Sequence, residues 1–379
     1  MAANLPVQTT QMHIDPAVID LGVGQPQFSL LPIDLIHRAA ERHFAQKDAN
    51  FLQYGAEQGD GYLLRELAHF LTQEYGFPVQ PETLFITNGA SSGLDLTCTL
   101  FTRPGDTIFV EEPSYFLAMQ IFADHRLRVV PIPIDEHGMA VEALEGELKK
   151  HHPVLVYTIP TFQNPSGHTL SEERRRRLAQ LSSEYDFLIV ADEVYHLLNF
   201  TALPPTPLAG YAGLGKIISL GSFSKILAPG LRLGWIQTDP ARVKTFVECG
   251  LVNSGGGLNP FTSAIIMKLI ESGGLKENIQ KLCSVYQARS AAMDAALRKY
   301  LPGAAYEVPQ GGYFYWIRLP NGRDAQALRK RAEDFQVSFR QGVLFSSQDG
   351  LRDFARLCFA FYEADQLTAG VERLMRTLA

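Results

Sequence analysis

The sequence predicts an α/β fold with a large domain, built on a mostly parallel sheet flanked by helices, and a smaller α+β domain. Short apolar runs alternate with helical patterns through the middle of the chain, and each run ends in polar residues, glycine or proline. Such runs are typical of strands buried on both faces of a parallel sheet. A length of 379 residues exceeds what one small core accommodates, which indicates two domains.

Five apolar runs are expected to form strands of the large sheet. A crossover helix follows the third run, because Ser171 can cap its start and two glutamates suit its first turn. The basic run Arg174–Arg177 lies on this helix, and the flanking acids predict a solvated, salt-bridged face rather than a nucleic-acid site. The five runs are Leu84–Thr87, Thr107–Val110, Val154–Thr158, Phe187–Ala191 and Lys216–Leu220.

The pattern changes from about residue 275, where helical stretches surround two further predicted strands, Gly311–Ile317 and Arg356–Phe361. The irregular N-terminal part, rich in glycine and proline around Gly22–Leu31, is expected to join this second unit. We therefore expect a large domain over residues 46–275 and a small domain made of residues 1–45 and 276–379.

Charge and composition exclude several classes of protein. The net charge of −6 is spread along the chain and offers no electrostatic reason to expect nucleic acid or an anionic membrane as a partner. Four separated cysteines without a CxxC spacing argue against a disulfide framework or a structural zinc site. Without a signal-peptide pattern or a long apolar stretch, a cytoplasmic protein is expected.

Lys225 lies in a serine-rich turn just after the predicted strand Lys216–Leu220. A lysine enclosed there loses hydration, which lowers the pKa of its amine and makes the neutral form available to attack an aldehyde. The two serines of the turn and Arg232 offer donors that suit an anion such as phosphate. The alternative is a solvated lysine in a surface loop.

Asp192 follows the predicted strand Phe187–Ala191. In open α/β sheets, ligands bind beyond the carboxyl ends of the strands. A carboxylate buried there needs a cationic partner, and a protonated pyridine nitrogen would serve. Tyr195, three residues further on, would add a phenolic hydrogen bond. The alternative is an aspartate that caps the next helix.

Two more turns follow predicted strands. Asn164 precedes a proline, which restricts its backbone and holds its amide in a defined place. Gly89, Ala90 and Ser91 open a helix, where free N–H groups and the positive end of the helix dipole favour an anion. Each segment by itself is also compatible with an ordinary turn.

Together the four segments resemble those of the fold-type-I pyridoxal-phosphate (PLP) enzymes, and within them the class I/II aminotransferases. The motifs occur in that family's order with similar spacing, and the resemblance covers nearly the whole chain. It implies the family's seven-stranded type of sheet and pyridoxal 5'-phosphate as cofactor. It also implies transfer of an amino group between an L-amino acid and a 2-oxo acid, in the branch of 2-aminoadipate, aromatic and branched-chain aminotransferases.

The resemblance implies a role for each candidate residue. Lys225 would hold the cofactor as a Schiff base and Asp192 would pair with the pyridinium nitrogen. Asn164 and Tyr195 would hydrogen-bond the phenolic oxygen of the ring, and Tyr115 would stack on the ring. The phosphate would be bound by Gly89, Ala90, Ser91, Ser222, Ser224 and Arg232.

A substrate site and a partner subunit are implied in the same way. Arg356 would bind the substrate carboxylate through a bidentate pair, with Asn164 beside it, and Gly24 would lie in a loop that covers the substrate. Tyr54 would reach the phosphate from the partner subunit, which implies a homodimer with shared active sites. The loop Gln25–Leu31 contains no arginine, so an acidic substrate is less supported.

Two alternatives remain open from the residues. The same site could serve a PLP-dependent lyase, decarboxylase or racemase, since sequence does not reveal which bond at Cα is broken. A non-catalytic PLP-sensing module, as in regulators that carry a winged helix-turn-helix, is disfavoured because the family pattern begins near the N-terminus.

Overall fold

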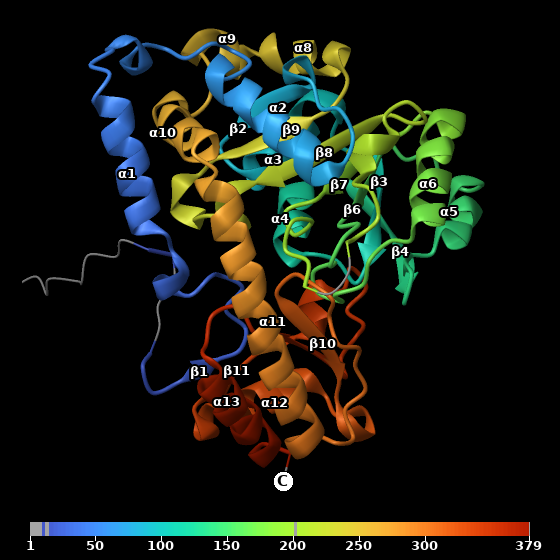
Figure 1. Cartoon of the computed structure of the whole chain (residues 1–379). Helices are drawn as coiled ribbons and strands as arrows, with labels where there is room; N and C mark the ends of the chain where they lie inside the picture. Colours follow the sequence, from blue (N-terminus) through green and yellow to red (C-terminus); the bar gives the residue numbers. More distant parts are fainter. Residues whose placement is uncertain (1–9, 12–14, 201–202, 379) are drawn as a thin grey trace, which may run out of the picture.

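An eight-stranded sheet forms the centre of the larger unit (Figure 1). The structure is a computed structural model that describes residues 10–11, 15–200 and 203–378. Neighbouring strands of the sheet follow the order β2-β9-β8-β7-β6-β3-β4-β5. In that order, the strands are β2 (Leu84–Thr87), β9 (Gly234–Gln237), β8 (Ile217–Ser222), β7 (Leu188–Asp192), β6 (Leu155–Thr158), β3 (Thr107–Glu112), β4 (Arg128–Asp135) and β5 (Gly138–Met139).

The sheet is mostly parallel, as predicted. Strands β4, β3, β6, β7 and β8 pair in parallel, whereas β9 runs antiparallel to both of its neighbours and β5 antiparallel to β4. The carboxyl ends of the parallel strands therefore lie along one edge. Since successive side chains face opposite sides, both faces must be covered by apolar contacts. One apolar cluster includes Val110, Tyr157 and Val190, and the other includes Phe109, Val156 and Ile189.

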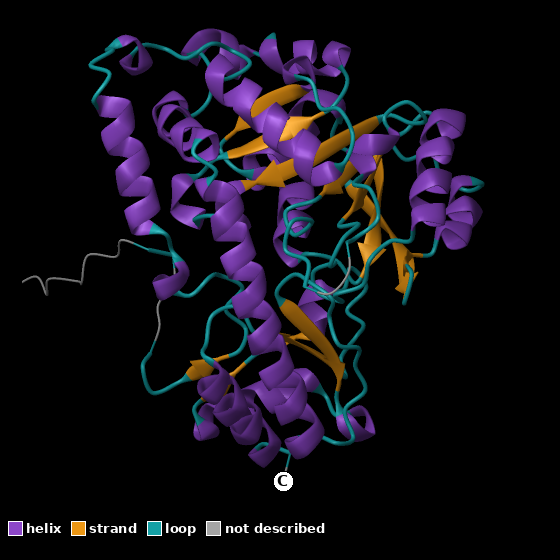
Figure 2. Cartoon of the chain, in the orientation of Figure 1, coloured by secondary structure: helices purple, strands orange, loops and turns teal. Residues whose placement is uncertain are grey.

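Helices cover both faces of the large sheet (Figure 2). The connections between parallel strands pass through them, as the alternation of apolar runs and helical patterns indicated, except that the connection from β7 to β8 contains only a 3₁₀ turn, Leu208–Tyr211. The helices of this unit are α2 (Gly61–Tyr75), α3 (Ala90–Phe101), α4 (Phe116–Asp124), α5 (Val141–Leu148), α6 (Glu172–Tyr185), α7 (Phe223–Ile226), α8 (Pro240–Val247), α9 (Gly250–Gly255) and α10 (Pro260–Glu271). Helix α1 (Ile33–Phe44), from the segment expected to join the small domain, packs on α10.

A smaller α+β unit lies beside the carboxyl edge of the large sheet (Figure 1). It contains an antiparallel sheet in the order β10-β13-β12 and a two-stranded parallel pair, β1 with β11. Its strands are β1 (Ile19–Asp20), β10 (Phe314–Arg318), β11 (Val337–Ser338), β12 (Arg340–Gln341) and β13 (Phe354–Cys358), and its helices are α11 (Gly274–Tyr300), α12 (Ala325–Ala332) and α13 (Ala364–Arg376).

The N-terminal segment pairs with the C-terminal part, because β1 hydrogen-bonds to β11. Helix α11 begins at Gly274, next to the expected domain boundary, and runs the length of the smaller unit (Figure 1). The division at residues 45/46 and 275/276 stays a prediction. Short 3₁₀ turns complete the chain: Phe28–Leu30, Asn50–Leu52, Pro81–Thr83, Leu208–Tyr211, Pro229–Leu231, Pro320–Gly322, Glu333–Phe335 and Gly342–Phe345.

Three strands of the large sheet, β4, β5 and β9, were not foreseen, and β5 has only two residues. Strand β4 contains Pro131 and Pro133, which weaken a strand pattern because proline lacks the N–H that a ladder uses. Strand β9 is short and directly follows the glycine-containing turn after Lys225. The sequence pattern therefore did not distinguish this strand from the loop before it. The five predicted runs all form strands, with ends that differ by at most two residues.

The basic run on α6 differs from the expectation at one position. Arg174 and Arg177 make exposed or half-buried ion pairs, as predicted, with Asp135 and with two glutamates. Arg175 is instead completely buried. Its guanidinium donates to the carbonyl oxygens of residues 160 and 170 and lies 3.7 Å from the Glu193 carboxylate. The expectation of a solvated face is therefore wrong for Arg175, which points inward where the helix packs on the sheet.

The four cysteines are free thiols. Among the described residues, no helix combines the length and apolar character that crossing a bilayer requires.

Candidate active site

The candidate residues from four separate turns meet at the carboxyl edge of the large sheet. Asp192 is the last residue of β7, and Lys225 lies on α7 directly after β8. Asn164 follows β6 in the loop before α6. Because β6, β7 and β8 are adjacent and parallel, their carboxyl ends lie side by side, and the smaller unit adds Arg356 from β13.

The amine of Lys225 is enclosed between aromatic rings and the N-terminal loop. Its Nζ donates to the carbonyl oxygen of Gly24 at 2.8 Å and lies 5.3 Å from the ring centre of Tyr313 and 5.9 Å from that of Tyr195. Burial lowers the pKa of Lys225 to about 8, and the nearby Arg356 cation also lowers it. A useful fraction of the amine is therefore neutral near pH 7–8, as a nucleophile or base requires.

Asp192 carries one oxygen that has no protein partner. Its Oδ2 accepts a hydrogen bond from the Tyr157 hydroxyl at 2.9 Å, whereas its Oδ1 is buried and makes no hydrogen bond within the described part of the chain. Burial raises the pKa of Asp192 to about 6, against the Tyr157 hydrogen bond, the nearby backbone N–H of Val194 and the Lys225 charge, which lower it. A cationic ring nitrogen placed at Oδ1 would satisfy this oxygen.

Arg356 and Asn164 are bound to each other across the two units. Nη1 of Arg356 donates to Oδ1 of Asn164 at 2.9 Å, and Nη2 donates to the Gly22 carbonyl at 3.0 Å. The guanidinium lies between the rings of Phe314 and Phe345, 4.0 and 5.0 Å from their centres. Arg356 is 3% exposed, which excludes a surface arginine, and this stacked position presents a planar cation suited to a carboxylate.

Hydrogen-bond donors lie together at the start of α3 and in the turn after α7. No side chain caps α3, which leaves its first N–H groups free. Arg232 donates to Ser224 Oγ at 3.4 Å and to the Asn88 carbonyl at 3.0 Å, while Ser222 Oγ accepts from the backbone of Ser224. A Cβ at Gly89 would come within 2.8 Å of Arg232 Nη2. The glycine therefore keeps open a space that a phosphate group fits.

The other expected residues fall into two groups. Tyr115 directly precedes α4 and is half-buried. Burial raises the pKa of Tyr115 to about 12; the Asp192 charge raises it further, and the Arg356 charge lowers it. Tyr195 is buried, with its ring 5.9 Å from that of Phe314. The structure thus brings Tyr115, Tyr195 and Gly24 to the site. Tyr54 differs: its side chain is 85% exposed and makes no hydrogen bond within the residues the structure describes.

Sequence reasoning missed a buried carboxylate behind the site. Glu111, near the end of β3, accepts hydrogen bonds from Thr158 Oγ1 at 2.5 Å, from the backbone of Ile159 at 3.0 Å and from Gln163 Nε2 at 3.2 Å. Gln163 also donates to the Pro113 carbonyl at 2.8 Å. These bonds tie the loop that carries Asn164 to the segment that precedes Tyr115. The available signal was that Glu111, like Asp192, ends an apolar run.

Tyr157 and Tyr313 were missed for a different reason. Both are completely buried in the apolar core and lie within ordinary apolar runs. Only the structure shows that the Tyr157 hydroxyl reaches Asp192 and that the Tyr313 hydroxyl donates to the Lys225 carbonyl oxygen at 3.0 Å.

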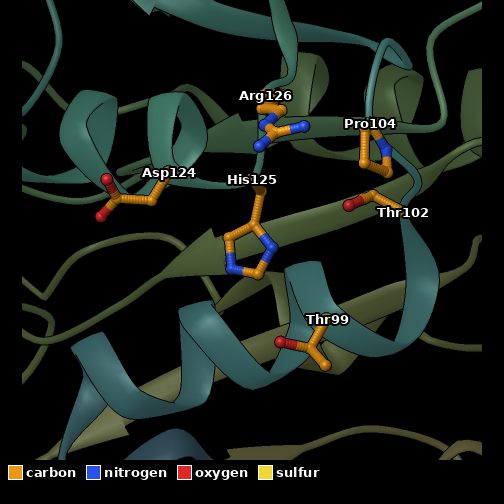
Figure 3. A pocket seen from close by; sticks show the side chains of 6 residues that line it. All are labelled: Thr99, Thr102, Pro104, Asp124, His125 and Arg126. Carbon is orange, nitrogen blue, oxygen red and sulfur yellow. The ribbon is translucent and has the colours of Figure 1, made fainter.

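A hollow is lined by residues other than these (Figure 3). Its lining residues come from the C-terminal ends of α3 and α4 and from the segments that follow them: Thr99, Thr102, Pro104, Asp124, His125 and Arg126. His125 is bound to Asp95 at 2.8 Å. None of the expected site residues reaches this hollow.

The chain belongs to the class I and II aminotransferases, because that family's model matches residues 16–374. It is an enzyme of the transferase class that moves an amino group between an amino acid and a 2-oxo acid. The family is one whose members use pyridoxal phosphate, which agrees with the fit of the site.

Individual relatives agree with this assignment. The chain is 35% identical to aromatic-amino-acid aminotransferase 1 of Thermococcus litoralis over 95% of this chain and 88% of that protein. The crystal structure of Pyrococcus horikoshii kynurenine aminotransferase with PMP superposes with a TM-score of 0.90 at 33% identity, covering 96% and 91% of the two chains. That of the α-aminoadipate aminotransferase of Thermus thermophilus superposes with 0.87 at 31% identity, covering 96% and 92%.

Proposed function

We propose that this aminotransferase binds pyridoxal phosphate at Lys225 and acts as a homodimer with shared active sites. The observation that carries the cofactor proposal is the unpaired, buried Oδ1 of Asp192 beside the enclosed amine of Lys225. An oxygen left without a partner at the carboxyl edge of the sheet is costly unless a ligand cation satisfies it. The open space at Gly89 supports a phosphate group on the same ligand.

The cofactor and the protein would contribute different parts of the reaction. Pyridoxal phosphate, when bound, supplies an aldehyde that accepts the amino group and a ring that takes up the charge developing at the substrate's Cα. Asp192 would keep the ring nitrogen protonated, with Tyr157 fixing the carboxylate orientation. Arg232, the serines Ser222 and Ser224 and the start of α3 would hold the phosphate.

Lys225 would then move protons. With its pKa lowered to about 8, its Nζ can accept the substrate's α-proton and return it. Arg356 would hold the α-carboxylate so that the Cα–H bond faces this amine. Asn164, held by Arg356, and Tyr195 would donate to the phenolic oxygen. The Gly24 loop would cover the substrate and exclude water.

Three measurements test the cofactor proposal. Purified protein with pyridoxal phosphate should absorb as an imine, and borohydride should label Lys225 in a peptide map. Lys225→Arg retains the charge and Lys225→Ala removes it, and both should lose turnover by at least about 10³-fold, because neither can move the α-proton. Labelling at another lysine, or full activity of either variant, would contradict the proposal.

One experiment also separates transamination from the lyase, decarboxylase and racemase reactions. An amino donor alone should convert bound aldehyde to the amine form of the cofactor and release one equivalent of 2-oxo acid. A lyase, decarboxylase or racemase would leave the aldehyde form in place. Screening donors with pyruvate and 2-oxoglutarate as acceptors would then identify the amino donor.

The homodimer is supported by exposed apolar surface around Tyr54. Phe44 of α1 and Phe261 of α10 are about half exposed, with ring centres 6.2 Å apart, and Leu52 and Tyr54 beside them are more exposed still. Contiguous exposed apolar surface is typical of a protein interface. Tyr54, which is 85% exposed in one chain, would reach the phosphate of the partner subunit.

Mixing two inactive variants tests this arrangement. Lys225→Ala lacks the amine but keeps Tyr54, whereas Tyr54→Ala lacks only the tyrosine. If Tyr54 serves the partner's site, the mixed dimer contains one complete site, and activity should reappear after mixing and exchange. A chain that sediments as a monomer, or a mixture that stays inactive, would contradict the proposal. The cytoplasmic location stays a prediction.

A further inference from the structure

The short helix that carries Lys225 cannot satisfy its own last carbonyl groups. Helix α7 spans only Phe223–Ile226, and the N–H that would bind the Lys225 carbonyl belongs to the residue four positions further on. That residue is Pro229, which has no N–H. Leu227 already leaves the helical conformation, with φ −141° and ψ −80°, so the ladder does not continue past the helix. The turn therefore needs donors from elsewhere in the chain.

Two side chains of the smaller unit supply these donors. The Tyr313 hydroxyl donates to the carbonyl oxygen of Lys225 at 3.0 Å, and Nδ2 of Asn278 donates to that of Ile226 at 2.8 Å. Tyr313 is completely buried and Asn278 is 3% exposed, so bulk water does not compete for either bond. Tyr313 directly precedes β10, whereas Asn278 lies on α11. The backbone of Lys225 is therefore held by the unit that also provides Arg356.

The surroundings of the Tyr313 hydroxyl keep it a donor to Lys225. Burial raises the pKa of Tyr313 well above its ordinary value, so the hydroxyl retains its proton. The hydroxyl of Tyr286 lies 3.4 Å from that of Tyr313 and can donate to its oxygen, because the one hydrogen of Tyr313 points to Lys225. The ring centre of Tyr313 also lies 5.3 Å from Nζ of Lys225. Tyr313 therefore lies beside both ends of the lysine, the carbonyl group and the amine.

The next residue along the chain, Phe314, lies beside Arg356. Its ring centre is 4.0 Å from the guanidinium. Successive side chains of an extended segment point to opposite sides, so residues 313 and 314 reach two different groups of the site. In the proposed reaction Arg356 holds the α-carboxylate and Lys225 takes the α-proton. This short segment therefore links the group that would hold the substrate to the group that would move its proton.

We propose that Tyr313, together with Asn278, is a positioning residue that holds the Lys225 amine in line with the Cα–H bond of the substrate; this rests on the proposed function of the site. The hydroxyl acts through the lysine backbone and not on the substrate. A loosened turn would let Nζ shift, and a displacement of about 1 Å can cost about 10²-fold in rate. Substrate binding would change little, because Arg356 keeps its place between two aromatic rings.

Steady-state kinetics of Tyr313→Phe test the proposal, because phenylalanine keeps the ring and loses only the hydroxyl. The kcat should fall about 10–100-fold, while KM for the amino donor changes less than about threefold. Tyr315→Phe is the matched control. Tyr315 is equally buried, two residues further along, and its hydroxyl donates to the Ser290 carbonyl of α11 at 2.9 Å. This control should keep the wild-type kcat, and equal losses of kcat in the two variants would overturn the proposal.

Amide hydrogen exchange of the full-length, cofactor-free protein gives a readout that does not depend on turnover. The peptide with residues 223–228 should exchange about tenfold faster or more in Tyr313→Phe, because the unpaired Lys225 carbonyl makes the turn easier to open. Asn278→Leu, which has a similar size and no N–H donor, should accelerate the same peptide, and Tyr315→Phe should not. Exchange at the wild-type rate in both Tyr313→Phe and Asn278→Leu would contradict the proposal.

A free amine separates positioning from a direct role in the reaction. In Lys225→Ala, ethylamine added to the solution can take over the proton transfer, and this amine is not attached to the turn. The rescued rate should therefore agree within about twofold whether tyrosine or phenylalanine occupies position 313. A rescued rate that falls as far as kcat does in Tyr313→Phe would mean that the hydroxyl acts on the substrate itself, and the inference would be wrong.

The proposed function and this inference fail in different ways. A wild-type protein that forms no imine with pyridoxal phosphate overturns the proposed function, whatever the exchange rates are. Normal imine formation in Tyr313→Phe, with kcat and the exchange of residues 223–228 both unchanged, overturns the inference alone.

Discussion

Replacing Asp192 with asparagine should stabilise the cofactor-free protein and at the same time abolish catalysis. Burial raises the pKa of Asp192 from 3.8 to about 6, so the ionised carboxylate lowers the unfolding free energy of the protein at pH 7. The shift of about 2 units corresponds to about 3 kcal/mol of unfolding free energy at about 1.36 kcal/mol per unit. Asparagine removes the charge and keeps an oxygen for the Tyr157 hydroxyl.

The sign of the pH dependence follows from proton binding. Between pH 3.8 and 6, the folded Asp192 holds a proton that the unfolded chain has lost, so the stability of the wild type falls as the pH rises through this window. Above about pH 6 both states are ionised and the cost is constant. The advantage of Asp192→Asn should therefore be about 3 kcal/mol at pH 7, about half of that at pH 5, and small near pH 4.

Urea denaturation of the cofactor-free proteins at these three pH values measures the effect. Asp34→Asn, an exposed position in the first turn of α1, is the control and should change the unfolding free energy by less than about 0.5 kcal/mol at each pH. An advantage of Asp192→Asn that is equal at pH 5 and pH 7, or a variant less stable than the wild type at pH 7, would refute the reasoning from burial.

Three further substitutions address other parts of the site. Gly89→Ala should weaken pyridoxal-phosphate binding by about tenfold or more in a cofactor titration, since its Cβ would crowd the arginine of the proposed phosphate site; Gly105→Ala, at a similar positive φ with open space around it, should bind normally. Glu111→Leu should raise KM for the amino donor about tenfold with a smaller change in kcat, because the Ile159 N–H and the Gln163 amide both lose their acceptor; an unchanged KM in steady-state kinetics would contradict this. Arg175→Met should lower the unfolding free energy by about 3–5 kcal/mol in urea, because it leaves a buried carboxylate unpaired, whereas Arg176→Met on the exposed face should cost less than about 0.5 kcal/mol; similar losses for the two would count against the buried pair.

Local sequence patterns determined five strands of the large sheet and the turns that follow them. Runs such as Leu84–Thr87 and Leu155–Thr158 are buried on both faces, so their apolar character is continuous and visible without a structure. Once these strands are parallel, Asp192 and Lys225 must lie at one edge, because each follows the carboxyl end of its strand. That is why the sequence could predict that these two candidate residues lie together.

The smaller unit and the supports of the site depended on the tertiary structure. Arg356 and Asn164 are 192 positions apart and meet only because β13 packs against the loop after β6. Arg175 sits in a basic run whose neighbours are solvated, and nothing in that run distinguishes the side chain that points inward. Helical periodicity by itself does not say which face of α6 the core covers.

The sequence by itself thus determined the class of fold, the strand ends and the amine and carboxylate that lie there, since these follow from short-range patterns of burial. Only the tertiary structure decided the environment of those groups: the unpaired oxygen of Asp192, the hydrogen bonds that Glu111 accepts and the bond between Arg356 and Asn164. The physical reason is that desolvation and hydrogen bonding depend on atoms brought from distant parts of the chain, which no local pattern contains.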